Sequence, residues 1–120
     1  MHELSIANAL VDELTRTGQS QGAIRIVSAV IRVGALSGVD PSLLQRAFEA
    51  ARASQPLTIQ TAIRVEEATV AIVCITCGRE GAAAATNDLR CVDCGSLNTQ
   101  VLGGNELLLL NVQMDVPVPA

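Results

Sequence analysis

The chain has 120 residues, a formal net charge of −4 and one aromatic residue, Phe48, although 49% of its residues are hydrophobic. This length holds one ordinary domain, or a small domain with a smaller insert, but not two full cores. All eight cationic residues are arginines, and they are scattered along the chain. The lack of clustered cations and of aromatic stacking platforms argues against nucleic-acid binding and against a polybasic membrane anchor.

The N-terminus has no basic flank followed by an apolar run and a small-residue cleavage site, so we expect no signal peptide. The longest leucine run, Leu107–Leu110, is far shorter than the stretch of about 20 residues that spans a membrane. The sequence therefore predicts a soluble cytoplasmic protein. In a reducing cytosol, the four cysteines favour metal binding over disulfide formation.

The first predicted element is an amphipathic helix that begins almost at residue 1. Glu3 suits the positive end of the helix dipole, and Gly18 is the expected stop. The apolar residues recur at spacings of three and four, which places them on one stripe. This stripe is formed by Leu4, Ala7, Leu10, Val11 and Leu14.

Residues 24–33 are rich in β-branched side chains and predict a strand whose two faces are both partly covered. A loop with two glycines and a serine follows at residues 34–38. Asp40 and Pro41 then predict the start of a second helix, from about Pro41 to Ala53. An aspartate caps free backbone N–H groups, and a proline at the first helical position gives up no N–H that the helix needs.

The clearest alternation of apolar and polar residues runs from Leu57 to Glu66 and predicts a half-buried strand. A last strand is expected over residues 107–116, and it should return to the first sheet, which makes the cysteine region an insert between two strands. The predicted fold class is therefore α+β, with two helices on a roughly three-stranded sheet and an inserted four-cysteine domain. The expected buried face of the last strand consists of Leu108, Leu110, Val112, Met114 and Val116.

The sequence contains two Cys-x-x-Cys-Gly knuckles, Cys74–Gly78 and Cys91–Gly95, with 13 residues between Cys77 and Cys91. The two-residue spacing lets both sulfurs of one turn reach the same metal, and the glycine permits a positive φ that turns backbone amides toward the thiolates. Four thiolates fill a tetrahedral shell and leave no open position, so the spacing predicts a structural zinc site in a zinc-ribbon-like insert. The predicted zinc ligands are Cys74, Cys77, Cys91 and Cys94.

Two disulfides, a thioredoxin-like redox pair and a four-cysteine iron site are the rival interpretations of these cysteines. Iron is the hardest of the three to exclude, and an iron protein of this type would be coloured when purified. Zinc would stabilise the folded insert, which has little hydrophobic core of its own because residues 82–85 and 87–90 offer little apolar surface. Metal binding by the insert would then be coupled to its folding.

His2 is the one histidine of the chain and follows the start methionine. Met1, His2 and Glu3 together place an α-amine, a backbone amide, an imidazole and a carboxylate within a few bonds. A deprotonated amide between the amine and the imidazole favours flat, nitrogen-rich coordination, which points to Ni(II) or Cu(II) rather than Zn(II). The plainer interpretation is that His2 is a polar residue at the head of a helix.

Several of these features together resemble the HypA/HybF family of hydrogenase nickel-incorporation proteins. The resemblance covers essentially the full length, and it is specific because the starting tripeptide and the zinc insert are unrelated features that this family combines. The residues that carry it are the start Met1–Ser5, the segment Val33–Pro41, the pair Phe48 and Glu49, and the two knuckles.

The resemblance implies a nickel metallochaperone without catalytic turnover. A nickel-binding α/β domain, here residues 1–69 and 104–120, would bind Ni(II) transiently through its N-terminus, beside a zinc-binding insert of residues 70–103 with structural Zn(II). Its partners would be the large-subunit precursor of [NiFe] hydrogenase and a HypB-type GTPase.

By position, the nickel ligands implied by the resemblance are His2, Met1 and Glu3. Asp40 aligns with an acidic residue suspected near the nickel in some relatives. Its own context already explains Asp40 as a helix cap, and this is the role that we favour, although one carboxylate could do both.

No nucleophile with a neighbouring base and no phosphate-binding loop stands out, so the sequence offers few candidate catalytic residues. One alternative is a zinc-ribbon protein-interaction or regulatory module in which His2 is incidental, and another is a small four-cysteine iron electron carrier. A sheet with two apolar faces would also favour edge pairing or self-association into a homo-oligomer.

Overall fold

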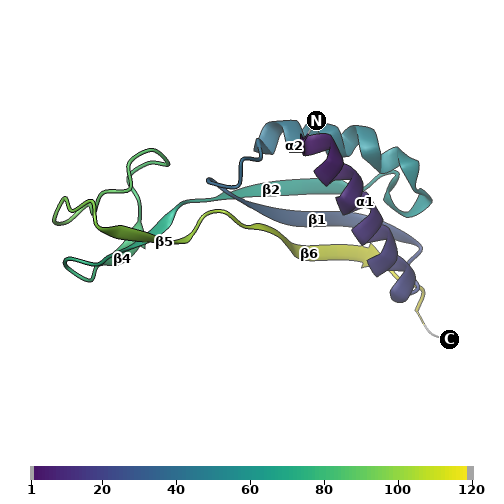
Figure 1. Ribbon diagram of the computed structural model, residues 1–120. Coiled ribbons are helices and arrows are strands. Elements are labelled where there is room, and N and C mark those ends of the chain that lie inside the picture. Colours follow the sequence, from purple (N-terminus) through teal and green to yellow (C-terminus); the bar gives the residue numbers. More distant parts are fainter. Residues whose placement is uncertain (1, 119–120) are drawn as a thin grey trace.

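The computed structural model describes residues 2–118 and arranges them as two small sheets in an elongated molecule of 60 × 35 × 16 Å (Figure 1). Met1 lies outside the described residues. In chain order the elements are α1 (His2–Ser20), β1 (Arg25–Gly34), α2 (Pro41–Ala51), two 3-10 turns (Arg52–Ser54 and Pro56–Thr58), β2 (Ala62–Ala68), β3 (Ala71–Cys74), β4 (Glu80–Ala82), β5 (Thr99–Gly103) and β6 (Leu107–Asp115). The α+β class expected from the sequence is confirmed.

β1 is the central strand of the first sheet, which has the order β2-β1-β6. β1 and β2 are parallel and are joined through α2, since parallel strands need a crossover connection. β6 is antiparallel to β1, so the chain returns to the first sheet after the cysteine region, as predicted.

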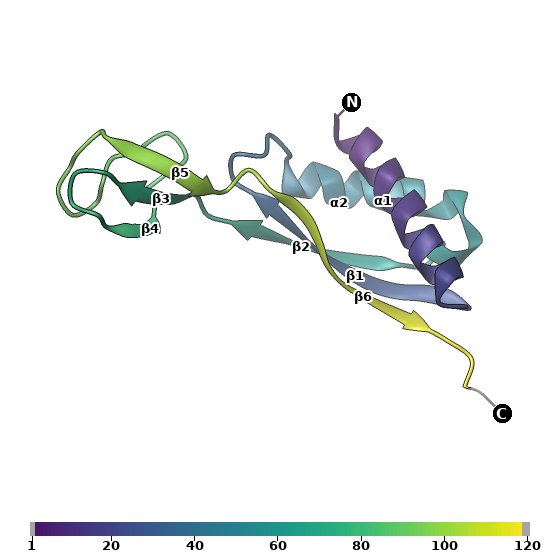
Figure 2. The same ribbon diagram turned by 60° about the horizontal axis from the view of Figure 1, so that its bottom comes forward.

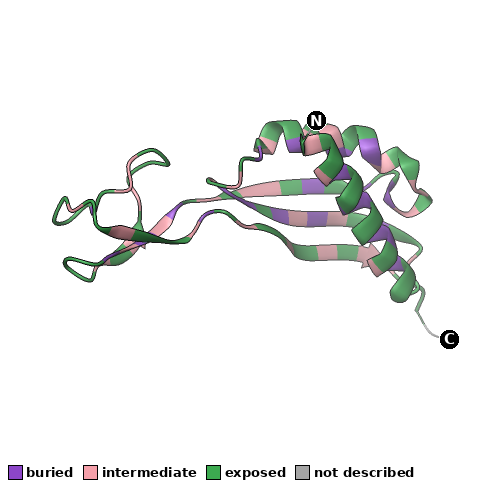
Figure 3. Cartoon of the chain, viewed as in Figure 1, coloured by how far each residue is buried: buried purple, intermediate pink, exposed green. Residues whose placement is uncertain are grey.

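Both helices pack on the same face of the first sheet (Figure 2). The core between the helices and the sheet is aliphatic except for the ring of Phe48. Figure 3 shows buried positions on α1, α2 and β1, whereas the loops of the second sheet are mostly exposed. The largest fully buried side chains of this core are Phe48, Leu14, Ile26, Ile31, Leu44, Val11 and Val33.

The start of α2 is confirmed in detail. The Asp40 carboxylate accepts hydrogen bonds from the backbone N–H groups of Ser42, at 2.9 Å, and Leu43, at 3.2 Å, and Pro41 occupies the first helical position. The α-helix ends at Ala51, slightly before the expected Ala53, and continues as a 3-10 turn.

The prediction that α1 stops at Gly18 is wrong, because this glycine serves close packing rather than termination. A Cβ atom on Gly18 would lie 2.8 Å from Cδ1 of Ile26 and 3.2 Å from Cδ1 of Leu57. The helix continues to Ser20, and Gly22, with a φ of 68°, makes the turn that leads to β1.

The prediction that both faces of the first strand are partly covered is also wrong. Ile26, Ala29, Ile31 and Val33 are buried in the core under the helices. On the opposite face no layer of the described residues covers β1, and Val27 there is 40% exposed. A sequence rich in β-branched residues does not by itself distinguish one covered face from two.

β2 begins at Ala62 and not at Leu57. Pro56 opens a 3-10 turn, and the buried hydroxyl of Thr58 donates to the carbonyl of Arg52 at 2.8 Å, which holds the chain in that turn. The alternation of residues 57–61 does not match their burial, because the apolar Ile59 is 54% exposed whereas the polar Thr58 and Thr61 are buried.

The predicted buried face of the last strand is wrong in part. Val112 and Met114 pack against the core, but Leu108 and Leu110 are 46% and 43% exposed. The reason is a β-bulge: Val30 pairs with Asn111 and Ile31 pairs with Leu109, so Leu110 is an extra residue that shifts the alternation. Leu109 therefore packs against the core in place of Leu108, and Val116 lies beyond the end of the strand.

The second sheet has the order β4-β3-β5, with antiparallel pairing throughout. It joins the first sheet where the chain enters β3 and leaves β5, next to the end of β1. The backbones approach closely there, since a Cβ atom on Gly34 would lie 2.2 Å from the carbonyl oxygen of Gly104. The division into a domain of residues 1–69 and 104–120 and an insert of residues 70–103 stays a prediction, because strand pairing does not define independent folding.

Candidate metal centre

The two cysteine knuckles have the same local geometry. In the first, the N–H of Gly78 donates to the carbonyl of Cys74 at 2.9 Å, and in the second, the N–H of Gly95 donates to the carbonyl of Cys91 at 2.9 Å. Both glycines have a positive φ, 79° and 74°. The expected role of these glycines is therefore confirmed, because a residue with a Cβ atom adopts this conformation at a cost.

Each knuckle also turns a backbone amide toward its first sulfur. The N–H of Cys77 donates to Sγ of Cys74 at 3.4 Å, and the N–H of Cys94 donates to Sγ of Cys91 at 3.5 Å. Hydrogen bonds of this kind favour the thiolate, which is the form of cysteine that binds a metal.

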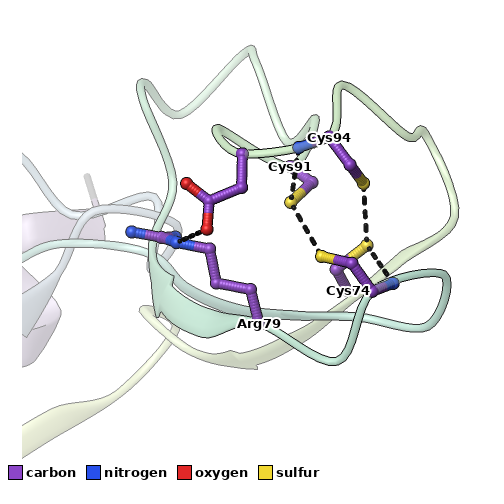
Figure 4. A network of polar contacts seen from close by, with 6 residues as sticks. Cys74, Arg79, Cys91 and Cys94 are labelled. Carbon is purple, nitrogen blue, oxygen red and sulfur yellow. Dashed lines mark hydrogen bonds and ion pairs between the residues drawn. The ribbon is translucent and has the colours of Figure 1, made fainter.

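The fold brings all four sulfurs together from the two knuckles (Figure 4). Sγ of Cys74 lies 3.6 Å from Sγ of Cys94, Sγ of Cys77 lies 3.6 Å from Sγ of Cys91, and all four sulfurs lie within 4.8 Å of one another. Four sulfurs bound tetrahedrally to zinc at about 2.3 Å would lie about 3.8 Å apart. The cluster therefore fits one tetrahedral metal ion, and all four cysteines are free thiols rather than disulfide partners.

The sulfurs strongly affect one another's ionisation. The backbone N–H of Cys77 is the main cause that lowers the pKa of Cys74 to about 6, and that of Cys94 likewise lowers the pKa of Cys91. At Cys77 the backbone N–H of Arg79 acts to lower the pKa, but the neighbouring sulfurs outweigh it and raise the pKa to about 12. Four thiolates this close repel one another, so ionising all of them requires a cation at their centre.

Two side-chain contacts join the knuckles to each other. Nε of Arg79, just after the first knuckle, lies 2.9 Å from Oδ2 of Asp93 in the second (Figure 4). The hydroxyl oxygens of Thr76 and Ser96 lie 2.9 Å apart. We did not predict these four residues from the sequence; the available signal was the opposite charge of Arg79, which follows the first knuckle, and Asp93, within the second.

Two of the predicted nickel residues, His2 and Glu3, lie in the first turn of α1, away from the cysteine cluster. His2 is exposed, and Oε2 of Glu3 accepts a hydrogen bond from the backbone N–H of Asp40 at 3.1 Å. This bond is the main cause that lowers the pKa of Glu3. The structure therefore brings Glu3 beside the start of α2, whereas Met1, the remaining predicted ligand, lies outside the described residues.

The cap of α2 engages one oxygen of the Asp40 carboxylate, Oδ1. Besides the two backbone N–H groups, the hydroxyl of Ser42 donates to its Oδ1 at 2.8 Å, and this hydroxyl is the main cause that lowers the pKa of Asp40. Over residues 2–118, the four cysteines are the one group of three or more His, Cys, Asp or Glu side chains whose ligand atoms converge as a metal site requires. His2, Glu3 and Asp40 do not converge in this way.

The fold and the site together define a class of protein: a small α+β protein that carries a closed four-sulfur metal site on an insert. Comparison with known families narrows this class. The family model for HypA, described as hydrogenase/urease nickel incorporation metallochaperone, matches residues 1–114. The chain belongs to the HypA family, which consists of metallochaperones and not of enzymes.

Individual relatives agree with this family. The hydrogenase maturation factor HypA of Nitrosospira multiformis is 37% identical over 114 residues, which cover 95% of this chain and 97% of the relative. The protein of the same name from Aquifex aeolicus is 32% identical over 116 residues, covering 97% of this chain and 99% of the relative.

Solved structures show the same fold. The solution structure of the Ni metallochaperone HypA from Helicobacter pylori has a TM-score of 0.68 at 25% identity and covers 96% of this chain and 98% of that one. A second solution structure of a HypA protein has a TM-score of 0.71 at 27% identity, covering 95% of this chain and 96% of that one. The fold expected from the sequence is thus that of HypA. None of the described helices is both long enough and apolar enough to cross a membrane.

Proposed function

We propose that this chain binds Ni(II) at its N-terminus and delivers it during the maturation of [NiFe] hydrogenase. The observation that carries the proposal is the exposed His2 at the first turn of α1, on a chain that belongs to a nickel-incorporation family over residues 1–114. An exposed imidazole at a chain end is accessible both to a metal donor and to a metal acceptor, which a carrier needs.

In this proposal the nickel ligands come from the first three residues. His2 supplies its imidazole and a backbone amide, Met1 supplies the α-amine, and Glu3 supplies a backbone or carboxylate group. Flat coordination by nitrogen and oxygen suits Ni(II) and disfavours Zn(II), which prefers a tetrahedron. The Glu3–Asp40 hydrogen bond of 3.1 Å supports the proposal, because it holds the start of α1 against the rigid N-terminus of α2.

The four cysteines would hold a structural Zn(II) ion. The support for this assignment is the tetrahedral spacing of the sulfurs and the absence of a fifth ligand in the donor set of the described residues, which leaves no open position for substrate. Zinc bound there would act on the insert as a cross-link between the two knuckles, and nickel would remain at the chain terminus, because its preferred geometry differs.

The partners that we propose follow from the family. The recipient is the precursor of the hydrogenase large subunit, and a HypB-type GTPase assists the transfer. Delivery to such a precursor would take place in the cytoplasm. The names of the curated relatives, which are hydrogenase maturation factors, support this assignment at the level of the maturation machinery.

The test is a titration of purified, untagged, zinc-loaded protein with Ni(II), comparing the wild type with His2→Ala. We expect the substitution to abolish the tight nickel site and to leave the zinc content unchanged, because the two sites share no ligand. Asn8→Ala, an exposed change on the same helix, is the matched control and should bind nickel like the wild type. Equal nickel affinity in the wild type and His2→Ala would refute the nickel assignment and favour an interaction module with an incidental His2.

A further inference from the structure

The sulfurs of the candidate metal centre form two close contacts that each join one knuckle to the other (Figure 4). Sγ of Cys74 lies 3.6 Å from Sγ of Cys94. Sγ of Cys77 lies 3.6 Å from Sγ of Cys91. The sulfurs of a disulfide are about 2.05 Å apart, so each pair would need to close by only about 1.5 Å. The arrangement therefore suits two disulfides that cross from one knuckle to the other.

Each of these pairs combines one exposed cysteine with one buried cysteine. Cys77 and Cys94 are exposed, whereas Cys74 and Cys91 are buried. An exposed thiolate can meet an oxidant from solvent, and a second thiolate beside it can then displace the oxidised oxygen and close a disulfide. Each pair therefore contains one residue that a dissolved oxidant reaches and one neighbour that can complete the disulfide.

We propose that this centre is a site of modification by hydrogen peroxide, which links the two knuckles through two disulfides and releases the bound zinc. The disulfides join Cys77 to Cys91 and Cys94 to Cys74. The inference rests on the proposal that the four cysteines hold zinc, which keeps them as reactive thiolates, and a disulfide offers no thiolate to a metal. The two disulfides replace zinc as the link between the knuckles, since the residues that they join are 14 and 20 positions apart.

The chemistry balances with one peroxide molecule for each pair. The Cys77 thiolate attacks one peroxide oxygen, the O–O bond breaks and hydroxide leaves, so that Cys77 becomes a sulfenic acid. The Cys91 thiolate then attacks the oxidised sulfur, forms the S–S bond and displaces a second hydroxide. Two protons from solvent convert the hydroxides to water, and the pair has lost two electrons. Cys94 and Cys74 react in the same way with a second peroxide molecule.

The positions of the arginines make the disulfide pairing directly measurable. Trypsin cleaves after Arg64, Arg79 and Arg90, so it separates peptide 65–79, which holds the first knuckle, from peptide 91–120, which holds the second. The zinc-loaded full chain is treated with hydrogen peroxide while a metal-sensitive dye follows zinc release. Remaining thiols are then blocked, and the protein is unfolded and digested without reductant.

We expect peroxide to cause loss of the zinc and recovery of the two peptides as one linked species, which dithiothreitol separates. Disulfides within each knuckle would instead leave the peptides separate. Fragmentation of the linked species between Cys74 and Cys77 should assign Cys74 to Cys94 and Cys77 to Cys91. A gel without reductant should show the size of a single 12.5 kDa chain, because both links form within one molecule.

Two controls isolate the effect of peroxide on the cysteines. Protein stripped of zinc by a chelator, without peroxide, should give two separate peptides. Met114→Leu removes an oxidisable sulfur outside the metal centre and should release zinc at the wild-type rate. The zinc content of the untreated protein tests the zinc assignment separately, so failure of that assignment is distinguishable from failure of this inference.

Several results would overturn the proposal. Peroxide that leaves the zinc bound would do so. Separate peptides after zinc release would also do so, whether they carry disulfides within each knuckle or sulfinic acids. Links between different chains, or pairing of Cys74 with Cys91, would contradict the cross-links that the sulfur contacts indicate.

Discussion

Asp40 has two predicted roles, one from a local structural rule and one from the family resemblance, and the two can be separated by experiment. The Asp-Pro pair predicted a helix cap, and the structure confirms it through three hydrogen bonds to the carboxylate from Ser42 and Leu43. A nickel-binding role for Asp40 stays a prediction: the cap uses Oδ1, and the second carboxylate oxygen, Oδ2, takes no part in it.

Substituting Asp40 by Asn therefore separates the two roles. Asn caps helices about as well as Asp, so we expect Asp40→Asn to keep the thermal midpoint and the nickel affinity near the wild-type values, while Asp40→Ala lowers the midpoint. Thermal unfolding and nickel titration of the same samples check this. If Asp40→Asn weakened nickel binding as much as His2→Ala, Asp40 would be a ligand and the cap would not be its main role.

A second test asks whether the free α-amine of Met1 is a nickel ligand. Residues added ahead of Met1 convert the amine into an amide, so we expect an N-terminal extension to weaken nickel binding while zinc stays bound. The measurement is a nickel titration of one preparation before and after protease removal of the extension, with an extension at the C-terminus as the control. Equal affinity before and after removal would mean that the amine is not a ligand.

The contact between Arg79 and Asp93 predicts that its loss changes the rate at which the protein releases zinc. Their contact joins the two knuckles, whereas Arg90 pairs with Asp88 within the segment that precedes the second knuckle. Because the Arg79–Asp93 pair is partly exposed, we expect Arg79→Met to speed zinc release to a chelator only about threefold. Arg90→Met is the control and should leave the release rate unchanged. A release rate for Arg79→Met equal to that of the wild type would contradict a role for this pair in holding the knuckles together.

The site residues differ in how far the sequence could predict them. The four cysteines were predictable because their spacing acts through local turns, and the fold brings their sulfurs together as expected. The contacts of Arg79 with Asp93 and of Thr76 with Ser96 depend on how two separate turns face each other, which spacing alone does not specify. Whether the sites hold zinc and nickel stays a prediction.

At the scale of elements, the sequence predicted those whose signals are local. The cap at Asp40 and the central strand at residues 25–34 appear where expected. The errors fall where tertiary packing overrides the local pattern: Gly18 lies within α1, where Ile26 and Leu57 leave no room for a Cβ atom, and Leu110 is shifted by a bulge that arises only in pairing with β1. A period of two also cannot show in advance that residues 57–61 form a turn.

The packing of α2 on the sheet depends on Phe48, the one aromatic residue and a fully buried one. Replacing it by Ala should lower the free energy of unfolding by about 3–5 kcal/mol, because the aliphatic neighbours cannot fill the space. Phe48→Leu, which keeps most of the volume, should cost less than half of that. Urea unfolding measures both, and a loss below about 1 kcal/mol for Phe48→Ala would contradict the core as described.

Buried hydrophobic residues are distributed unevenly over the molecule. In the described part of the second sheet and its loops, the buried hydrophobic residues are Val70, Ile72, Cys74 and Cys91, of which two are metal-ligand candidates. We therefore expect that removal of zinc by a chelator unfolds the insert and exposes residues 75–98 to proteolysis, while the first sheet and its helices remain folded. Cys91→Ser should behave like the zinc-free protein. Protease resistance of the loops without zinc would contradict this dependence.

The two proposed metal sites lie at different places in the molecule and use different chemistry, so one spectrum can distinguish them. The most direct measurement is nickel X-ray absorption on the zinc-loaded, untagged protein with one equivalent of Ni(II). We expect planar coordination by nitrogen and oxygen that includes an imidazole, with no sulfur ligand, and loss of the imidazole signal in His2→Ala. Sulfur ligands around the nickel, or the same spectrum from His2→Ala, would place the metal elsewhere and refute nickel binding at the N-terminus.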